Sequence, residues 1–142
     1  MIPSATKSYV LFPLGKKRFA LPAETVTELA RPDRLQPFPH TTPLQAGVLV
    51  RRGRILPVFD VAQVLVPAAA PPRRFYLIAN RRIESVSEPT AIPVSGECEL
   101  ASLAMIPPTG RLPEYVCGLL PLKDELVEVV DLEALAATEE SR

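Results

Sequence analysis

Few side chains in this sequence could carry out chemistry. The 142 residues include one histidine, His40, and two cysteines, Cys98 and Cys117. His40 lies among prolines and threonines, which is typical of a solvated loop histidine rather than a catalytic base. The cysteines lie among apolar residues, so we expect both to be small core residues. One imidazole and two thiols supply neither a four-ligand zinc site nor a disulfide framework. We therefore expect no metal, no cofactor and no catalytic residue, and enzyme activity is the weakest hypothesis.

Two aspartates occupy similar positions and could act as paired carboxylates. Asp60 and Asp131 each follow an apolar run and precede a short helical pattern. Aspartate is among the residues most favoured as a helix N-cap, where it accepts hydrogen bonds from free backbone N–H groups. We therefore predict that both aspartates are N-caps.

Two basic clusters could contact nucleic acid. They are Lys16-Lys17-Arg18 and Arg51-Arg52-Gly53-Arg54, and both lie at predicted hairpin turns. None of the five Phe and three Tyr residues is interleaved with them, so stacking of bases on aromatic rings has little support. Nucleic-acid binding is therefore one hypothesis for the function of this chain.

The elements that position these residues are short. Seventeen prolines are spread along the chain, and proline interrupts long helices. No apolar stretch approaches the ~20 residues that span a bilayer, so we expect a soluble, cytoplasmic protein. β-Prone runs separated by turns give about five strands in each half, with short helices expected at 61–65 and 132–137. A turn is predicted at Asn80–Arg82, and a proline-rich loop at 31–46.

The second half repeats the first. When the sequence is shifted by 71 residues, ten identities occur over positions 20–64, where composition alone would give about three. They include Gly47 with Gly118 and Asp60 with Asp131. We interpret this as duplication of a small all-β unit. Five strands leave costly sheet edges unless the sheet curls closed, so two partly open barrels packed together are expected.

The repeat also predicts a core and a charged pair. Glu28 and Arg52 correspond to Glu99 and Lys123, so each half carries a carboxylate and a cation at the same two positions. We predict that a strand carboxylate faces a cation at a hairpin turn. One apolar core is expected between the barrels, formed by Leu11, Phe19, Val48, Ile55, Val58, Leu77, Ile92, Leu119, Val127 and Val129.

The first half contains a distinctive set of motifs. These are Ala20-Leu21-Pro22, Val26-Thr27-Glu28 and the segment 47–60, which reads Gly-Val-x-x-x-Arg-Gly-x-x-x-Pro-Val-x-Asp. With these motifs the chain resembles the CheW-like family of chemotaxis coupling proteins over about residues 8–137. The resemblance implies one CheW-like domain, 1–142, made of two SH3-like five-stranded barrels at approximately 8–71 and 72–137.

The same resemblance implies a non-enzymatic signalling adaptor. Such proteins link the cytoplasmic tips of chemoreceptors to the regulatory domain of a CheA-type histidine kinase. By matching positions, the receptor-binding residues are expected to be Glu28, Arg52 and Gly53. The kinase-binding residues are expected to be Val26, Gly47, Val48 and Leu56.

The charges are distributed unevenly although the formal net charge is zero. Residues 1–71 hold nine Lys or Arg and four Asp or Glu, whereas residues 72–142 hold seven and twelve. If each half forms one barrel, the molecule has a basic end and an acidic end. Such a dipole favours weak head-to-tail self-association that strengthens as salt is lowered.

Overall fold

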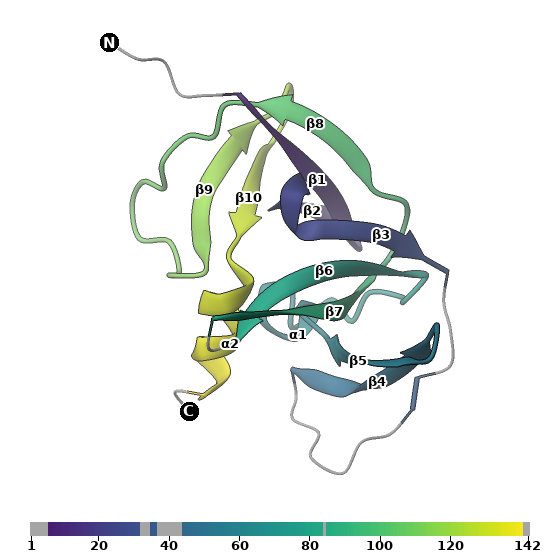
Figure 1. The fold of residues 1–142 in the computed structure, drawn as a ribbon. Helices are drawn as coiled ribbons and strands as arrows, with labels where there is room; N and C mark the ends of the chain where they lie inside the picture. Colours follow the sequence, from purple (N-terminus) through teal and green to yellow (C-terminus); the bar gives the residue numbers. More distant parts are fainter. Residues whose placement is uncertain (1–5, 32–34, 37–43, 84, 141–142) are drawn as a thin grey trace.

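The computed structural model describes residues 6–31, 35–36, 44–83 and 85–140, and within them the chain is built mainly of β-strands (Figure 1). His40 and most of the loop predicted at 31–46 lie outside these residues. The strands are β1 (Lys7–Leu14), β2 (Lys17–Pro22), β3 (Val26–Ala30), β4 (Gln45–Arg51), β5 (Arg54–Phe59), β6 (Phe75–Ile83), β7 (Val86–Val94), β8 (Glu99–Leu103), β9 (Val116–Pro121) and β10 (Leu126–Val130). The helices are the 3-10 turn η1 (Ala23–Thr25), α1 (Ala62–Leu65) and α2 (Leu132–Glu140).

The strands form two five-stranded sheets, which confirms the all-β, double-barrel prediction. Barrel A has the order β8-β1-β2-β10-β9 and barrel B the order β3-β6-β7-β5-β4. In Figure 1, barrel A lies above barrel B. The expected division at about 8–71 and 72–137 does not correspond to these sheets. Each repeat gives its first hairpin to the other repeat's barrel: β1–β2 joins β8–β10, and β6–β7 joins β3–β5.

The exchanged hairpins are buried on both faces over part of their length, which explains the continuous apolar runs at residues 10–14 in β1 and 75–79 in β6. In β1, Tyr9 and Leu11 face the interior of barrel A, while Val10, Phe12 and Leu14 face the space between the barrels. The same alternation in β6 places Tyr76 and Ile78 inside barrel B and Leu77 and Ala79 between the barrels. These hairpins therefore form the wall that the two barrels share.

The predicted single core is wrong, because the buried apolar residues form three clusters. Phe19, Leu77 and Ile92 lie between the barrels, as expected. The interiors of barrels A and B hold the other members, which are Leu11, Val127 and Val129 in A and Val58 in B. Ile55 is exposed, Leu119 is half-buried, and Val48 is buried outside all three clusters.

Two matched glycines allow each barrel to close partly on itself. The chain beyond β3 returns to β4 through a pair of backbone hydrogen bonds between Gln36 and Val48, and Ile106 meets Leu119 in the same way beyond β8. A Cβ on Gly47 would lie 2.4 Å from the Gln36 carbonyl oxygen, and a Cβ on Gly118 would lie 2.2 Å from the Met105 sulfur. Gly47 is required because a Cβ there would meet the Gln36 backbone, whereas a Cβ at Gly118 would displace only the flexible Met105 side chain.

Two local predictions need correction. The turn expected at Asn80–Arg82 is strand instead, since β6 continues to Ile83 and pairs with Val86 across the hairpin. Asp131 caps α2 as predicted, because its Oδ1 accepts hydrogen bonds from the N–H groups of Glu133 and Ala134 at 3.0 and 3.2 Å. Asp60 does not cap α1, whose first turn has no side-chain cap.

The hairpin exchange also changes the meaning of the charge asymmetry. Residues 23–94, which contain all strands of barrel B, hold nine Arg and six acidic residues. The rest of the chain holds seven basic and ten acidic residues. The cluster Lys16-Lys17-Arg18 belongs to the more acidic barrel A, so the two ends differ by less than the halves of the sequence suggest.

Candidate functional site: a groove between the barrels

A groove of about 490 Å³ runs between β3 of barrel B and β8 of barrel A. Both strands are sheet edges, and each carries the repeated Glu-Leu pair, Glu28-Leu29 on β3 and Glu99-Leu100 on β8. The remaining lining residues are mainly apolar and come from both repeats: Val10, Ala23, Val26, Thr27, Leu77 and Cys98. Leu29 and Leu100 are 37% and 74% exposed. The groove therefore offers apolar surface with one carboxylate on each wall.

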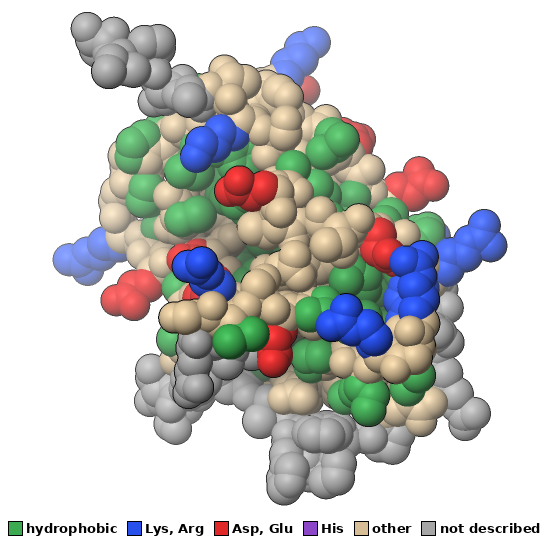
Figure 2. Space-filling model, in the orientation of Figure 1, with side chains coloured by type: hydrophobic (Ala, Val, Ile, Leu, Met, Phe, Trp, Pro, Cys, Tyr) green, Lys and Arg blue, Asp and Glu red, His purple; other side chains and the backbone are tan. Residues whose placement is uncertain are grey.

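The carboxylate of Glu28 binds two arginines from the β4–β5 hairpin, which confirms the predicted contact between Glu28 and Arg52. Arg52 Nη1 lies 3.4 Å from Glu28 Oε2. Arg51, which was predicted as part of a basic cluster but not as a partner of Glu28, donates from Nε to Glu28 Oε1 at 2.8 Å and also pairs through Nη2. In Figure 2, acidic and basic side chains adjoin where the end of β3 meets the β4–β5 turn, with hydrophobic side chains beside them.

The turn that presents Arg52 has a backbone rarely adopted by arginine. Arg51 pairs with Arg54, so Arg52 and Gly53 are the two central residues of the hairpin loop. Their φ angles are 51° and 74°. Two positive φ values define a type I′ turn, in which Gly53 is unstrained and Asn or Asp is preferred at the position of Arg52. Backbone strain of this kind often occurs at functional positions.

The second repeat does not reproduce this pair. Glu99 binds Arg18 Nη1 at 3.2 Å rather than Lys123, the cation that the repeat predicted. Arg18 also donates from Nε to Glu125 Oε1 at 2.9 Å. Each wall of the groove thus has a glutamate paired with arginine from its own barrel, but the cation comes from a different strand in each case.

The residues expected to contact the kinase do not form an exposed surface. Val26 is half-buried and lines the groove, whereas Gly47, Val48 and Leu56 are buried. Leu56 faces the interior of barrel B with Leu49. The sequence pattern left open which of these residues face outward; Leu56 faces inward, and Gly47 has no side chain and lies against Gln36.

Their neighbours on the outer face of the hairpin are exposed instead. Val50 and Ile55 are directly paired across β4 and β5, and they are 52% and 69% exposed. Leu126, the repeat counterpart of Ile55, is also exposed on barrel A. The run Gly47–Val50 is apolar on both faces, so alternation in the sequence did not distinguish its inward residues from its outward ones.

The cysteines differ from each other. Cys98 is half-buried and packs against the core between the barrels, and burial raises the pKa of its thiol to about 11. Cys117 is exposed, contrary to the prediction, and its thiol donates a hydrogen bond to the Val129 carbonyl at 3.4 Å. Partial burial and the nearby Asp131 carboxylate raise the Cys117 pKa. Both shifts disfavour the thiolate, which is the nucleophilic form.

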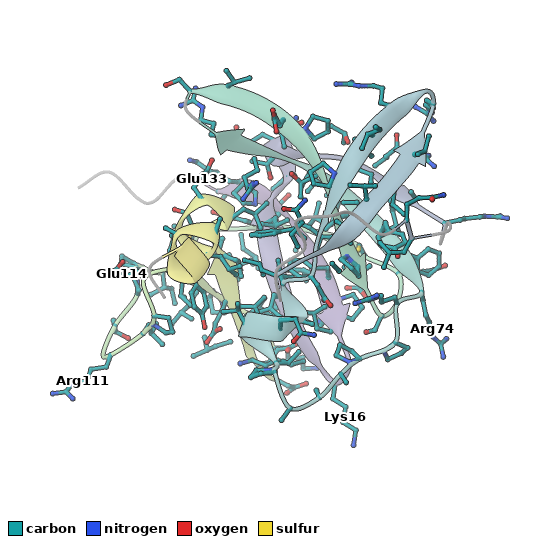
Figure 3. The ribbon with its side chains drawn as sticks, turned by 90° about the horizontal axis from the view of Figure 1, so that it is seen from below. Lys16, Arg74, Arg111, Glu114 and Glu133 are labelled. Carbon is teal, nitrogen blue, oxygen red and sulfur yellow. The ribbon has the colours of Figure 1, made fainter. Side chains whose placement is uncertain are left out.

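The basic clusters are largely paired with acidic side chains. Lys17 lies 3.9 Å from Glu128, Arg18 pairs with two glutamates, and Arg51 and Arg52 pair with Glu28. The exposed cations Lys16, Arg74 and Arg111 extend from separate parts of the molecule (Figure 3). This arrangement does not favour the nucleic-acid alternative, which requires cations gathered along one face.

Two SH3-like barrels with an apolar groove between them define a double-barrel binding module. The CheW-like domain model matches residues 8–140, and this chain belongs to the CheW-like family of chemotaxis scaffold proteins. The scaffolding protein TtCheW from Thermoanaerobacter tengcongensis has the same fold, with a TM-score of 0.77 and 20% identity over 92% of this chain and 87% of that one.

A sequence relative gives a more limited comparison. Protein FrzA of Myxococcus xanthus is 36% identical over 59 residues, which are 42% of this chain and 37% of FrzA. The match therefore spans well under half of either protein. Within the described residues, no helix is both long and apolar enough to cross a membrane.

Proposed function

We propose that this protein is a non-enzymatic adaptor that couples the cytoplasmic tips of chemoreceptors to the regulatory domain of a CheA-type histidine kinase, and that it acts in the cytoplasm. The observation that carries the proposal is the groove between β3 and β8, which combines apolar surface with paired charges in a chain of this family. Apolar surface supplies most of the binding free energy, while paired charges orient the partner.

The receptor contact is assigned to Glu28, Arg52 and Gly53. Arg52 is 75% exposed while its guanidinium touches Glu28, so it can remain paired and still meet a partner. Gly53 sets the turn that presents it. An exposed ion pair contributes only about 0–1 kcal/mol to stability, so changing Arg52 alters recognition more than folding.

The kinase contact is assigned to the outer face of the β4–β5 hairpin. Gly47, Val48 and Leu56 are buried in the same hairpin and support this surface, the exposed pair Val50 and Ile55 supplies the contact, and Val26 lines the groove instead. A directly paired valine and isoleucine on an outer sheet face is apolar area that a partner can cover.

Paired substitutions test both assignments. Ile55→Glu is expected to abolish capture of the kinase regulatory domain with little change in melting temperature, whereas Leu56→Glu is expected to unfold barrel B. Arg52→Glu is expected to weaken binding of a receptor-tip fragment and spare kinase binding. If Ile55→Glu folds and still binds the kinase, or Arg52→Glu still binds the receptor, the corresponding assignment is wrong.

Weak head-to-tail self-association is a lesser part of the proposal. It rests on the remaining charge difference between the barrels, and its attraction is screened over ~8 Å at physiological salt. Sedimentation velocity should show association that increases as salt is lowered and that decreases when Arg54 is changed to Glu. A sedimentation coefficient independent of both would remove it.

A further inference from the structure

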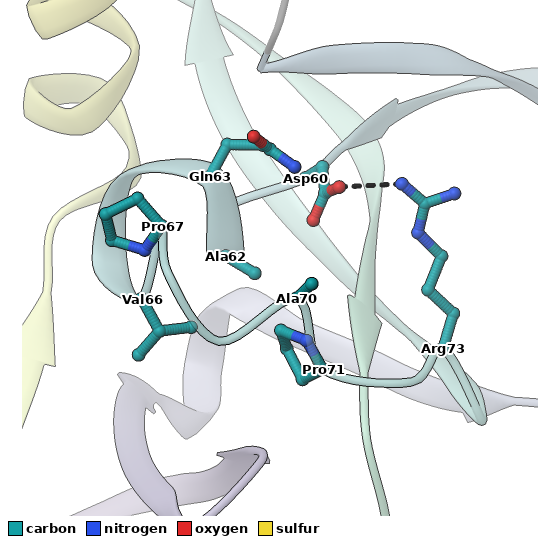
Figure 4. A pocket seen from close by; sticks show the side chains of 8 residues that line it. All are labelled: Asp60, Ala62, Gln63, Val66, Pro67, Ala70, Pro71 and Arg73. Carbon is teal, nitrogen blue, oxygen red and sulfur yellow. Dashed lines mark hydrogen bonds and ion pairs between the residues drawn. The ribbon is translucent and has the colours of Figure 1, made fainter.

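A second cavity lies in barrel B, on the connector that follows α1. Its volume is about 310 Å³, at the small end of the ~300–1,000 Å³ typical of ligand sites. The polar residues around it are Asp60, Gln63 and Arg73, and the apolar ones include Ala62, Val66, Pro67 and Pro71 (Figure 4). The cavity thus combines a carboxylate, a guanidinium group and a side-chain amide with aliphatic walls.

Asp60 is the unusual member of this cavity. Its side chain is only 7% exposed, and its Oδ2 accepts a hydrogen bond from Arg73 Nη2 at 2.7 Å. The other carboxylate oxygen has no hydrogen-bond partner within the described part of the chain, and in Figure 4 it faces the space beside Ala62 and Ala70. This oxygen is not among the fully buried atoms without a partner, so it is accessible from the cavity and can accept a hydrogen bond from a donor placed there.

The comparison between repeats gives an independent argument. Asp131, at the matching position, uses its carboxylate to cap α2. Asp60 leaves α1 without a side-chain cap and turns toward the cavity. Aspartate just before a helix usually stabilises it by capping the first N–H groups, and α1 lacks this stabilisation.

The connector that lines the cavity contains one strained residue. Residues 66–72 include three prolines, and Ala70 has a φ of 42°. Residues other than glycine rarely adopt a positive φ, and such strain clusters at ligand sites.

We infer that this cavity binds a free α-amino acid with an aliphatic side chain. The Asp60–Arg73 pair has no net charge, so it suits a ligand that also carries one positive and one negative group. The ligand's ammonium group would donate to Asp60 and Gln63, and its carboxylate would accept from the exposed donors of Arg73. Its side chain would contact Ala62, Val66 and the two prolines. This site is separate from the groove and from the proposed adaptor contacts.

Titrations of the ¹⁵N-labelled full chain, followed by NMR, test the proposal with L-leucine as probe. Leucine should produce saturable shifts confined to amides around 60–73. N-Acetyl-L-leucine lacks the ammonium group and L-leucinamide lacks the carboxylate, so each should bind at least about tenfold more weakly. Equal shifts with leucinamide would mean that only a cation is recognised, and no saturable shift with leucine would mean that the pair is purely structural. Either result overturns the inference.

Variants separate binding from folding. Asp60→Asn and Arg73→Gln should each weaken leucine binding at least about tenfold, while Arg74→Gln, an exposed neighbour outside the cavity, should not. Because Asp60→Asn could disturb the fold, Ala70→Leu provides a second test: it fills the cavity without removing either charged group. Loss of leucine binding with an unchanged melting temperature supports the site, and retained binding in Ala70→Leu refutes it.

Discussion

Arg52→Asn should make this protein more stable and less able to bind the chemoreceptor tip that we propose as its partner. Arg52 has a φ of 51° at the first central position of a type I′ turn, where asparagine is preferred. A side chain in this left-handed region costs roughly 1–2 kcal/mol, of which asparagine recovers an appreciable part. The substitution also removes the 3.4 Å contact with Glu28.

The gain in stability from the relaxed turn should exceed the loss from the broken ion pair. Arg52 is 75% exposed, which places its ion pair at the low end of the ~0–1 kcal/mol range, and Glu28 keeps Arg51 as a partner. The free energy of unfolding should therefore rise by about 0.5–1 kcal/mol. For a domain of this size that corresponds to about 2–4 °C in melting temperature.

Urea unfolding followed by far-UV circular dichroism measures the stability change, since the chain has no tryptophan. Pull-down with a receptor-tip fragment measures binding. Arg54→Asn is the matched control: it removes an exposed arginine from the same hairpin without changing a positive φ or the Glu28 pair. If Arg52→Asn lowers stability, or if Arg54→Asn raises it equally, the turn argument fails. If receptor binding is unchanged, Arg52 is not a receptor contact.

Three further substitutions test the packing. Gly118→Ala should cost no more than about 1 kcal/mol in urea unfolding because its Cβ meets only the flexible Met105 side chain, and Met105→Ala in the same chain should recover most of this loss. Thr90→Val should raise stability by about 1 kcal/mol, since the buried Thr90 hydroxyl has no hydrogen-bond partner within the described residues; a loss in calorimetry would show that it has one. Asp131→Ala should lose about 1 kcal/mol with its cap, and an unchanged midpoint would mean that α2 does not contribute to stability.

The sequence was sufficient to predict most of the strands and the double barrel, but not which hairpin belongs to which sheet. Strand pairing is read from which face is apolar, and β1 and β6 are apolar on both faces. The sequence of such a strand does not indicate whether the strand pairs with strands of its own repeat or with strands of the other repeat. A division of the chain into two consecutive barrels was therefore the simplest expectation, and the exchange could only be seen in three dimensions.

The part of the candidate site that could be predicted is the part where the repeat places opposite charges at matched positions. Glu28 and Arg52 were found because the repeat placed opposite charges at both positions. The contact of Arg51 with Glu28 was missed because a strand pattern does not show that the Arg51 side chain turns toward β3. Val50 and Ile55 were missed because Val48, Val50 and Leu49 look alike as apolar residues, although they lie on opposite faces of one strand.

The two repeats share more of their backbone structure than of their side-chain contacts. The same backbone bridge follows Gly47 and Gly118 in the two barrels, Gln36 with Val48 and Ile106 with Leu119, although only Gly47 lies against backbone of the crossing segment. Carboxylates at matched positions have taken different partners: Glu28 binds the β4–β5 turn, and Glu99 binds Arg18 on β2. The groove is consequently similar in shape on its two walls but different in charge geometry. A partner with two similar faces would fit its apolar surface in either direction, and the unequal ion pairs are what would select one orientation.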